Sequence, residues 1–120
     1  MIVEATMELL LTDAVYIISA PNGRPHNLQI MVTSRRIVAS WEPINCIERN
    51  GQITGYEVSC REEGEMPSGQ LNFTTSLTFT CEGLTPARTY IFHVAGVNTN
   101  GSGPPLEQTH TTEEERTFIV

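Results

Sequence analysis

The chain has 120 residues, a length that accommodates one compact domain and is too short for a second core. It is 39% hydrophobic and 18% charged, which is the composition of an ordinary folded protein and excludes a disordered chain. The formal net charge is −7 and every cationic side chain is arginine, so the surface repels phosphate backbones and no nucleic-acid partner is expected. No apolar run reaches the ~20 residues that would span a bilayer, so this segment is not expected to insert into a membrane.

The first 24 residues differ from the rest of the sequence. Their apolar residues are spaced too irregularly to favour helix or strand, and Pro21 to Pro25 is typical of a linker. Acidic residues interrupt the apolar stretches and no basic region precedes them, so a signal peptide is not expected. We therefore interpret residues 1–24 as an extension, and an extracellular chain would be a piece of a longer protein or would lack its true start.

From Pro25 onward, apolar residues alternate with polar ones, and turn residues interrupt the alternation at short intervals. Such alternation predicts strands with one buried face, because successive side chains of a strand point to opposite faces. Pro43 ends the second strand, and Asn45 to Gln52 form a loop with a turn at Asn50-Gly51. The alternating residues of the first three strands are Leu28, Ile30 and Val32; Ile37, Ala39 and Trp41; and Tyr56, Val58 and Cys60.

Four further strands follow in the same pattern. In the fourth, Leu71 and Phe73 share one face, and Asn72 lies on the other face, which we expect to point outward. Seven short strands separated by turns predict an all-β sandwich. The remaining sets are Leu77, Phe79 and Cys81; Tyr90, Phe92, Val94 and Gly96; and a last strand that runs from Gly103-Pro104-Pro105 to about Thr112.

A series of short motifs, in this order, resembles the fibronectin type III family. The resemblance implies a seven-stranded, immunoglobulin-like β-sandwich over residues 25–113, followed by a tail at 114–120. An immunoglobulin domain would instead carry cysteines on its second and sixth strands, which have none here. The motifs are Pro25-His26-Asn27-Leu28, Ser40-Trp41-Glu42-Pro43, Ile53-Thr54-Gly55-Tyr56-Glu57-Val58, Leu84-Thr85-Pro86 with Tyr90, Asn98 with Gly101, and Gly103-Pro104-Pro105.

The resemblance implies structural roles for four residues. Trp41 and Tyr56 would lie on opposite sheets and supply much of the core. Leu84 and Tyr90 would belong to a tyrosine corner, in which the phenol bonds to upstream backbone. Ala87 stands where the family commonly has glycine, so the sequence departs from the family pattern in the turn of this corner.

Three cysteines allow one disulfide and one remaining thiol, and they lack the CxxC spacing of zinc sites, so no metal is expected. In the implied topology, Cys60 and Cys81 face the core from opposite sheets at the same end of the sandwich, where a disulfide is geometrically feasible. The alternative is two buried free thiols, because cysteine is a common small core residue. Cys46 lies in a loop at the other end, and we expect it to be free or to pair with another chain.

Two N-glycosylation sequons are present, Asn72-Phe73-Thr74 and Asn100-Gly101-Ser102. We expect Asn72 to be accessible on a strand and Asn100 to be accessible at a loop tip. A chain with this many asparagine, serine and threonine residues yields about one such match by chance, so the sequons permit an extracellular location without establishing it.

The sequence offers no catalytic constellation. His26, His93 and His110 fall on different strands, and none has a serine, cysteine or carboxylate at the spacing of a triad or a metal site. We interpret them as surface residues. The glycines at Gly101 and Gly103 lead into a strand, whereas a phosphate-binding loop opens a helix. Neither enzymatic activity nor a cofactor is therefore expected.

The resemblance also implies that the loop at 43–52 and the loop at 98–103 lie at one end of the sandwich. Loops on a rigid scaffold are common recognition sites. The alternative is that these loops only connect strands. The candidate partner-binding residues are Glu48, Arg49, Asn50, Asn98 and Asn100.

The leading hypothesis that follows from the resemblance is a non-catalytic protein–protein interaction or adhesion module of a multi-domain extracellular or cell-surface receptor, with neighbouring extracellular domains. The alternatives are a passive spacer in a tandem array and an intracellular module such as those of muscle filament proteins. The last six residues, 115–120, also have the form of a carboxylate ligand for a PDZ groove, an interpretation that fails if the chain is a fragment.

Overall fold

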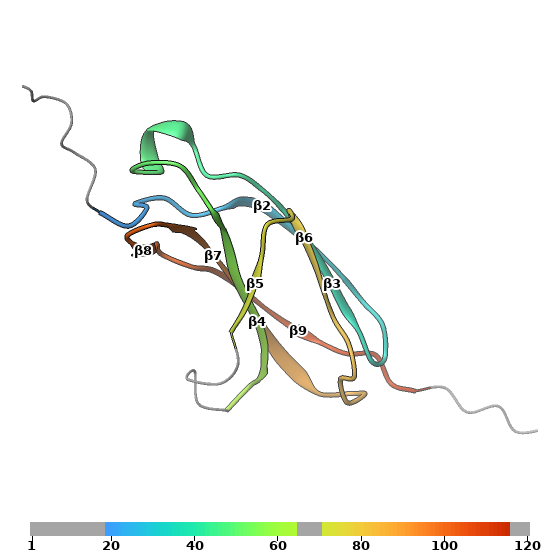
Figure 1. Cartoon of the computed structure of the whole chain (residues 1–120). Coiled ribbons are helices and arrows are strands. Elements are labelled where there is room, and N and C mark those ends of the chain that lie inside the picture. Colours follow the sequence, from blue (N-terminus) through green and yellow to red (C-terminus); the bar gives the residue numbers. More distant parts are fainter. Residues whose placement is uncertain (1–18, 65–70, 116–120) are drawn as a thin grey trace, which may run out of the picture.

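The computed structural model describes residues 19–64 and 71–115, and these residues form a β-sandwich (Figure 1). The predictions for residues 1–18 and for the C-terminal carboxylate lie outside the described residues. A 3₁₀ helix, η2 (Cys46–Glu48), interrupts the loop that follows the strand ending at Glu42 and precedes the strand starting at Gly55. The strands are β2 (His26–Val32), β3 (Ile37–Glu42), β4 (Gly55–Glu62), β5 (Asn72–Thr74), β6 (Thr78–Cys81), β7 (Thr89–Asn98), β8 (Gly101–Ser102) and β9 (Leu106–Thr111).

The strands form two antiparallel sheets. A three-stranded sheet has the order β2-β3-β6, and a five-stranded sheet has the order β5-β4-β7-β8 with β9 also paired to β7. The longest ladder joins β4 to β7, from Gly55 opposite Val97 to Glu62 opposite Tyr90. Each of the seven predicted alternating segments contains a strand, so the prediction of an all-β sandwich is confirmed. The short β8 is an addition, which pairs with the end of β7 and closes the turn after it.

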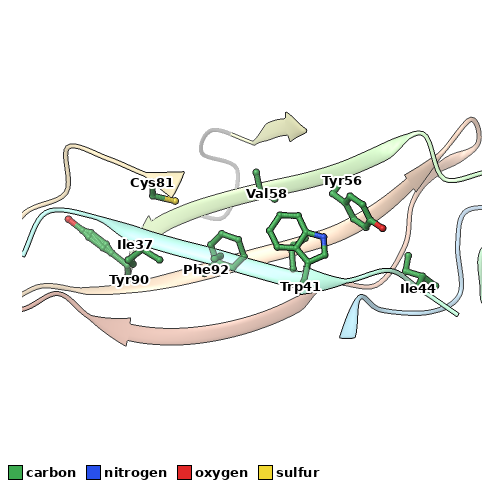
Figure 2. Close-up of a cluster of buried hydrophobic side chains, with 10 residues drawn as sticks. Ile37, Trp41, Ile44, Tyr56, Val58, Cys81, Tyr90 and Phe92 are labelled. Carbon is green, nitrogen blue, oxygen red and sulfur yellow. The ribbon is translucent and has the colours of Figure 1, made fainter. Parts of the chain in front are cut away.

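The core lies between the two sheets, where the inward-facing residues of β3, β4 and β7 meet. Trp41 on β3 contacts Tyr56 on β4 edge to face, with ring centroids 5.6 Å apart, and Phe92 on β7 at 6.1 Å. Figure 2 shows these aromatic rings in the middle of the cluster, with Tyr90 at one end and Ile44 at the other. The predicted core residues Trp41, Tyr56 and Tyr90 are buried, and Leu84 is half-buried against the same cluster.

The orientation of β5 differs from the sequence prediction. Phe73 lies opposite Glu57 on the outer face of the sheet and is 57% exposed, whereas Asn72 lies opposite the buried Val58, on the side of the other sheet. Asn72 is nevertheless exposed, because β5 is the edge of the five-stranded sheet. Alternation alone shows which residues share a face, but at an uncovered edge strand the apolar face need not be the inner one.

Candidate functional site

The two loops that were predicted to share one end of the sandwich are joined by hydrogen bonds from Asn98. This residue ends β7, and its Nδ2 donates to Arg49 O at 3.1 Å and to Asn50 O at 3.0 Å. Asn50 and Gly51 form the turn there with positive φ values of 52° and 118°, a conformation that asparagine and glycine tolerate best. The loop that contains η2 and the turn after β7 therefore form one connected surface.

Asn98 itself is not available to a partner, which corrects its assignment as a contact residue. Its side chain is only 4% exposed, and its Oδ1 accepts a hydrogen bond from Asn100 N at 2.8 Å. Asparagine often bonds to backbone in this way where it starts a turn. The family motif of Asn98 with Gly101 already indicated part of this role, because it suits a turn in which the asparagine side chain bonds its own backbone.

The segment before β2 lies across both loops. Asn98 Nδ2 also donates to Ser19 O at 2.9 Å, and Asn50 Nδ2 donates to Ala20 O at 2.8 Å. The backbone N–H groups of Asn22 and Gly23 both donate to Glu48 O, at 2.8 and 3.2 Å. Of the extension proposed for residues 1–24, the described part is thus hydrogen-bonded to the sandwich.

Two glycines allow this segment to pack closely. A Cβ on Gly103 would lie 2.6 Å from Pro21 O, and a Cβ on Gly23 would collide with the side chain of Glu48. Real Cβ atoms do not approach other atoms so closely, so either substitution would displace its neighbour. Pro21, Gly23 and Pro25 are all buried, and Arg24 Nε donates to Pro105 O at 2.9 Å.

The remaining candidate side chains at this end differ in their contacts and in their exposure to solvent. The guanidinium of Arg49 donates from Nε to Ile44 O at 2.8 Å, so this side chain supports its own loop. Asn100 is exposed at the turn. Sequence reasoning missed Ile47, which is 90% exposed on η2 and stands next to the exposed, unpaired thiol of Cys46.

An open groove runs beside this surface, between the segment before β2 and the start of β9. Its lining combines charged and polar side chains with proline and leucine, and Glu48 links it to the η2 loop. The residues that line it are Asn22, Gly23, Arg24, Pro25, His26, Asn27, Glu48, Pro104 and Leu106.

The tyrosine corner forms at the opposite end of the sandwich. Tyr90 Oη accepts a hydrogen bond from Thr85 N at 2.9 Å. Thr112 supports the corner, because its Oγ1 donates to Thr85 O at 2.7 Å and accepts from Arg88 N at 3.0 Å. Ala87 adopts a positive φ of 57°, the conformation for which the family commonly uses glycine. The departure at Ala87 therefore leaves the corner intact.

Cys60 and Cys81 form a disulfide that joins β4 to β6 and hence links the two sheets. The alternative of two buried free thiols is therefore wrong. Cys46 is a free, exposed cysteine, as the sequence led us to expect for a residue at the other end of the sandwich.

One histidine lies in a charged cluster that the sequence did not predict. His93 on β7 faces Glu107 on β9, with Nδ1 3.0 Å from Oε2, and Arg61 on β4 places its guanidinium 3.6 Å from the same oxygen. The hydrogen bond from His93, together with the charge of Arg61, holds the pKa of the Glu107 carboxyl below its usual value. His26 is exposed, and His110 Nε2 contacts the Gln108 amide at 3.0 Å. Within the described residues, no three His, Cys, Asp or Glu side chains are grouped as metal ligands would be.

Comparison with known proteins identifies the relatives of this chain. Residues 23–112 match the family model described as "Fibronectin type III domain". Neogenin from Mus musculus is 37% identical over 90 residues, which cover 72% of this chain and 6% of that protein. The human netrin receptor DCC is 34% identical over 101 residues, which cover 78% of this chain and 7% of that protein. Receptor-type tyrosine-protein phosphatase F from Mus musculus is 35% identical over 101 residues, which cover 82% of this chain and 5% of that protein. The chain thus spans less than a tenth of the length of these curated relatives.

Solved structures share the fold. The FN1–FN3 domains of chicken CNTN1 superpose with a TM-score of 0.70 at 22% identity, covering 79% of this chain and 33% of that one. The FN5 domain of Drosophila Lar gives a TM-score of 0.60 at 24% identity, covering 80% of this chain and all of the other. The receptor relatives and the disulfide both support the extracellular location that the sequence favoured. Among the described residues there is no helix with the length and apolar character needed to cross a membrane.

Proposed function

Because this chain belongs to the fibronectin type III family, we propose that it acts as a non-catalytic adhesion module of a larger receptor, and that it holds the polypeptide entering its first strand in a fixed direction. The observation that carries this proposal is the anchoring of residues 19–24 on the two loops at that end of the sandwich.

The anchoring uses contacts to separate parts of the chain, which is what a fixed direction requires. Glu48 O lies on the η2 loop, Asn98 ends β7, and Pro105 precedes β9. A single hydrogen bond contributes about 1 kcal/mol and would leave the segment free to pivot. Bonds to three elements, combined with the close packing of Pro21 on Gly103, restrict both its position and its direction.

The chemistry of the surface supports a binding role over a catalytic one. The His93–Glu107 pair lies on the face of a sheet, and Arg61 is the second contact of the carboxylate. Ser59 is the residue opposite His93 on β4, but within the described residues no hydrogen bond joins its hydroxyl to the imidazole, as an activated nucleophile would require. Since the relatives include proteins named as receptors, we propose a protein ligand for the receptor to which this module belongs.

The fixed direction is tested by ¹⁵N relaxation on the whole chain. We expect order parameters for residues 19–24 close to the ~0.85 of rigid backbone, as for β4 and β7. Gly103→Ala should lower them, because its Cβ would displace Pro21, and Ser102→Ala serves as the control on the neighbouring exposed residue. Values below about 0.6 in the unaltered chain would contradict the proposal.

A second candidate function is that of a passive spacer, and the structure contains an observation that favours it. Two of the predicted contact residues, Asn50 and Asn98, use their amides within the domain. The two functions are separated by the binding of a bivalent fusion of the whole chain to cultured cells. If the domain is adhesive, Ile47→Asp should reduce binding about tenfold. Met31→Asp is the control, because Met31 is also an exposed apolar residue but lies on β2, and it should leave binding unchanged. A spacer predicts no binding above that of the fusion partner alone.

A further inference from the structure

The sequence contains a stretch without charge that stands out in a chain of net charge −7. No Asp, Glu, Lys or Arg occurs from Met66 to Cys81. The described part of this stretch, residues 71–81, includes β5 and β6, between which the chain passes from the five-stranded sheet to the three-stranded sheet (Figure 1). We refer to residues 71–81 as the uncharged margin.

Both strands of the uncharged margin have a free edge. Among the described strands, β5 pairs only with β4, and β6 pairs only with β3. A free edge offers unpaired backbone groups to a strand of another molecule, and proteins commonly protect such edges with charged side chains or proline. The uncharged margin contains neither.

The same margin exposes apolar side chains. Leu71 is 52% exposed, Phe73 is 57% exposed and Leu77 is 39% exposed. Phe73 extends over Gly55 on the outer face of the sheet, where any Cβ would collide with its ring. Threonine and phenylalanine favour strands, and the margin has no charge and no proline, so it combines the features of an aggregation-prone edge.

The opposite side of the sandwich is protected differently. There Gln108 Nε2 on β9 donates to Leu28 O on β2 at 3.4 Å, and Arg24 Nε bonds to Pro105 O. β9 also carries the charged Glu107, which pairs with His93 and Arg61. The β5–β6 side has neither of these forms of protection among the described residues.

Asn72 occupies the first position of β5 and begins the sequon Asn72-Phe73-Thr74. Its side chain is exposed and forms no hydrogen bond to another described residue. We propose that Asn72 carries an N-linked glycan, and that this glycan protects the free β5 edge from pairing with a second copy of the chain. In an extracellular module, the glycan would perform the task that charged side chains perform on other edges.

The modification would take place in the secretory pathway with a lipid-pyrophosphate-linked oligosaccharide as donor. The bond between the sugar C1 and the pyrophosphate oxygen breaks, and a bond from C1 to Asn72 Nδ2 forms. The amide nitrogen loses one proton and the lipid pyrophosphate leaves, so nothing is oxidised or reduced. A neighbouring strand must approach to about 4.8 Å to pair. A bulky, hydrated oligosaccharide at Asn72 would prevent that approach.

The first test is occupancy. The whole chain, secreted from eukaryotic cells behind a supplied signal peptide, is analysed by intact mass and peptide mapping. We expect hexose-containing mass on the peptide with Asn72, and its loss in Asn72→Gln and in Thr74→Val, which leaves Asn72 in place. An unmodified Asn72 in the secreted protein overturns the proposal.

The second test separates edge protection from mere occupancy. Asn72→Gln and Asn72→Lys both remove the glycan, but only the lysine variant restores a charge to the edge. In sedimentation velocity we expect Asn72→Gln to self-associate at concentrations at least tenfold below those at which the glycosylated protein does, and Asn72→Lys to stay monomeric. Asn100→Gln is the control for the loss of the other sequon. A monomeric Asn72→Gln, or equal association of the two variants, overturns the protective role.

Neither result bears on the order of residues 19–24, so this inference and the proposed function fail separately.

Discussion

Ala87 shows how one residue can depart from a family pattern without changing the local fold. Its φ of 57° lies in the left-handed region, where a Cβ clashes with the neighbouring carbonyl oxygen and costs roughly 1–2 kcal/mol. The hydrogen bonds around Tyr90 and Thr112 hold the turn in place despite that cost. The tyrosine corner is therefore maintained by contacts outside the turn itself.

Ala87→Gly should stabilise the domain by about 1 kcal/mol, because glycine adopts this φ without the steric cost. For a domain of this size, thermal unfolding should shift upward by roughly 4–8 °C. Ala87→Val should shift it downward, since a β-branched residue is still less tolerant of positive φ. A glycine variant that melts at or below the original temperature would show that the turn is unstrained.

At the scale of the elements, a cluster of ionisable side chains from three strands lies on the outer face of the five-stranded sheet. Glu107 on β9 lies opposite His93 on β7, and Arg61 on β4, two residues beyond the one opposite His93, reaches the same carboxylate with its guanidinium. The carboxylate of Glu107 is the common partner of the Arg61 guanidinium and the His93 imidazole. This arrangement makes the pairing of β7 with β9 sensitive to pH.

The pKa of Glu107 is lowered by the hydrogen bond from His93 and by the charge of Arg61, so the folded state favours the carboxylate form. The resulting stability is fully present above the ordinary value of 4.5 and is lost as pH falls through the lowered folded pKa. When the pH falls from about 5 to about 3, the Glu107→Gln variant should therefore lose less free energy of unfolding than the original protein does.

Urea unfolding at a series of pH values measures this effect. Glu57→Gln, which removes a carboxylate from the same face without breaking an ion pair among the described residues, is the matched control. If Glu107→Gln and Glu57→Gln change the acid dependence equally, the cross-strand cluster does not contribute to it.

At the scale of the whole molecule, the two sheets are held together by the core and by one covalent link. The core places Trp41 of the three-stranded sheet against Tyr56 and Phe92 of the five-stranded sheet. The disulfide between Cys60 and Cys81 adds a link between the same two sheets, over a sequence separation of 21 residues. It lies on the β5–β6 side, where the backbone edges are free.

Replacing both Cys60 and Cys81 by alanine should cost about 3 kcal/mol of stability, since closing a loop of ~20 residues restricts the unfolded chain by that amount. Guanidinium unfolding of the variant and of the original protein gives the difference directly. Cys46→Ser should have no effect, because this thiol is exposed and unpaired. A variant as stable as the original would mean that the core alone fixes the two sheets.

The sequence by itself determined the strands, the residues that share each strand face and the family. Alternation fixes which side chains lie together on a strand, because the strand period is two regardless of what surrounds it. Tyr90 and Thr85 lie only five residues apart, so the tyrosine corner is also a local feature that motifs can predict. The family topology made a disulfide between Cys60 and Cys81 feasible and left two free thiols as the alternative, and the structure decided between them.

Only the tertiary structure decided what depends on contacts between distant segments. The inner face of β5 could not be predicted, because an edge strand has no opposing layer to select it. The role of Asn98 depends on carbonyl groups of Ser19 and Asn50, which lie 79 and 48 residues away in the chain. The pairing of His93 with Glu107 depends on strand register, and the anchoring of residues 19–24 depends on which loops converge beside them. These features arise from the spatial arrangement of elements, for which local periodicity carries no signal.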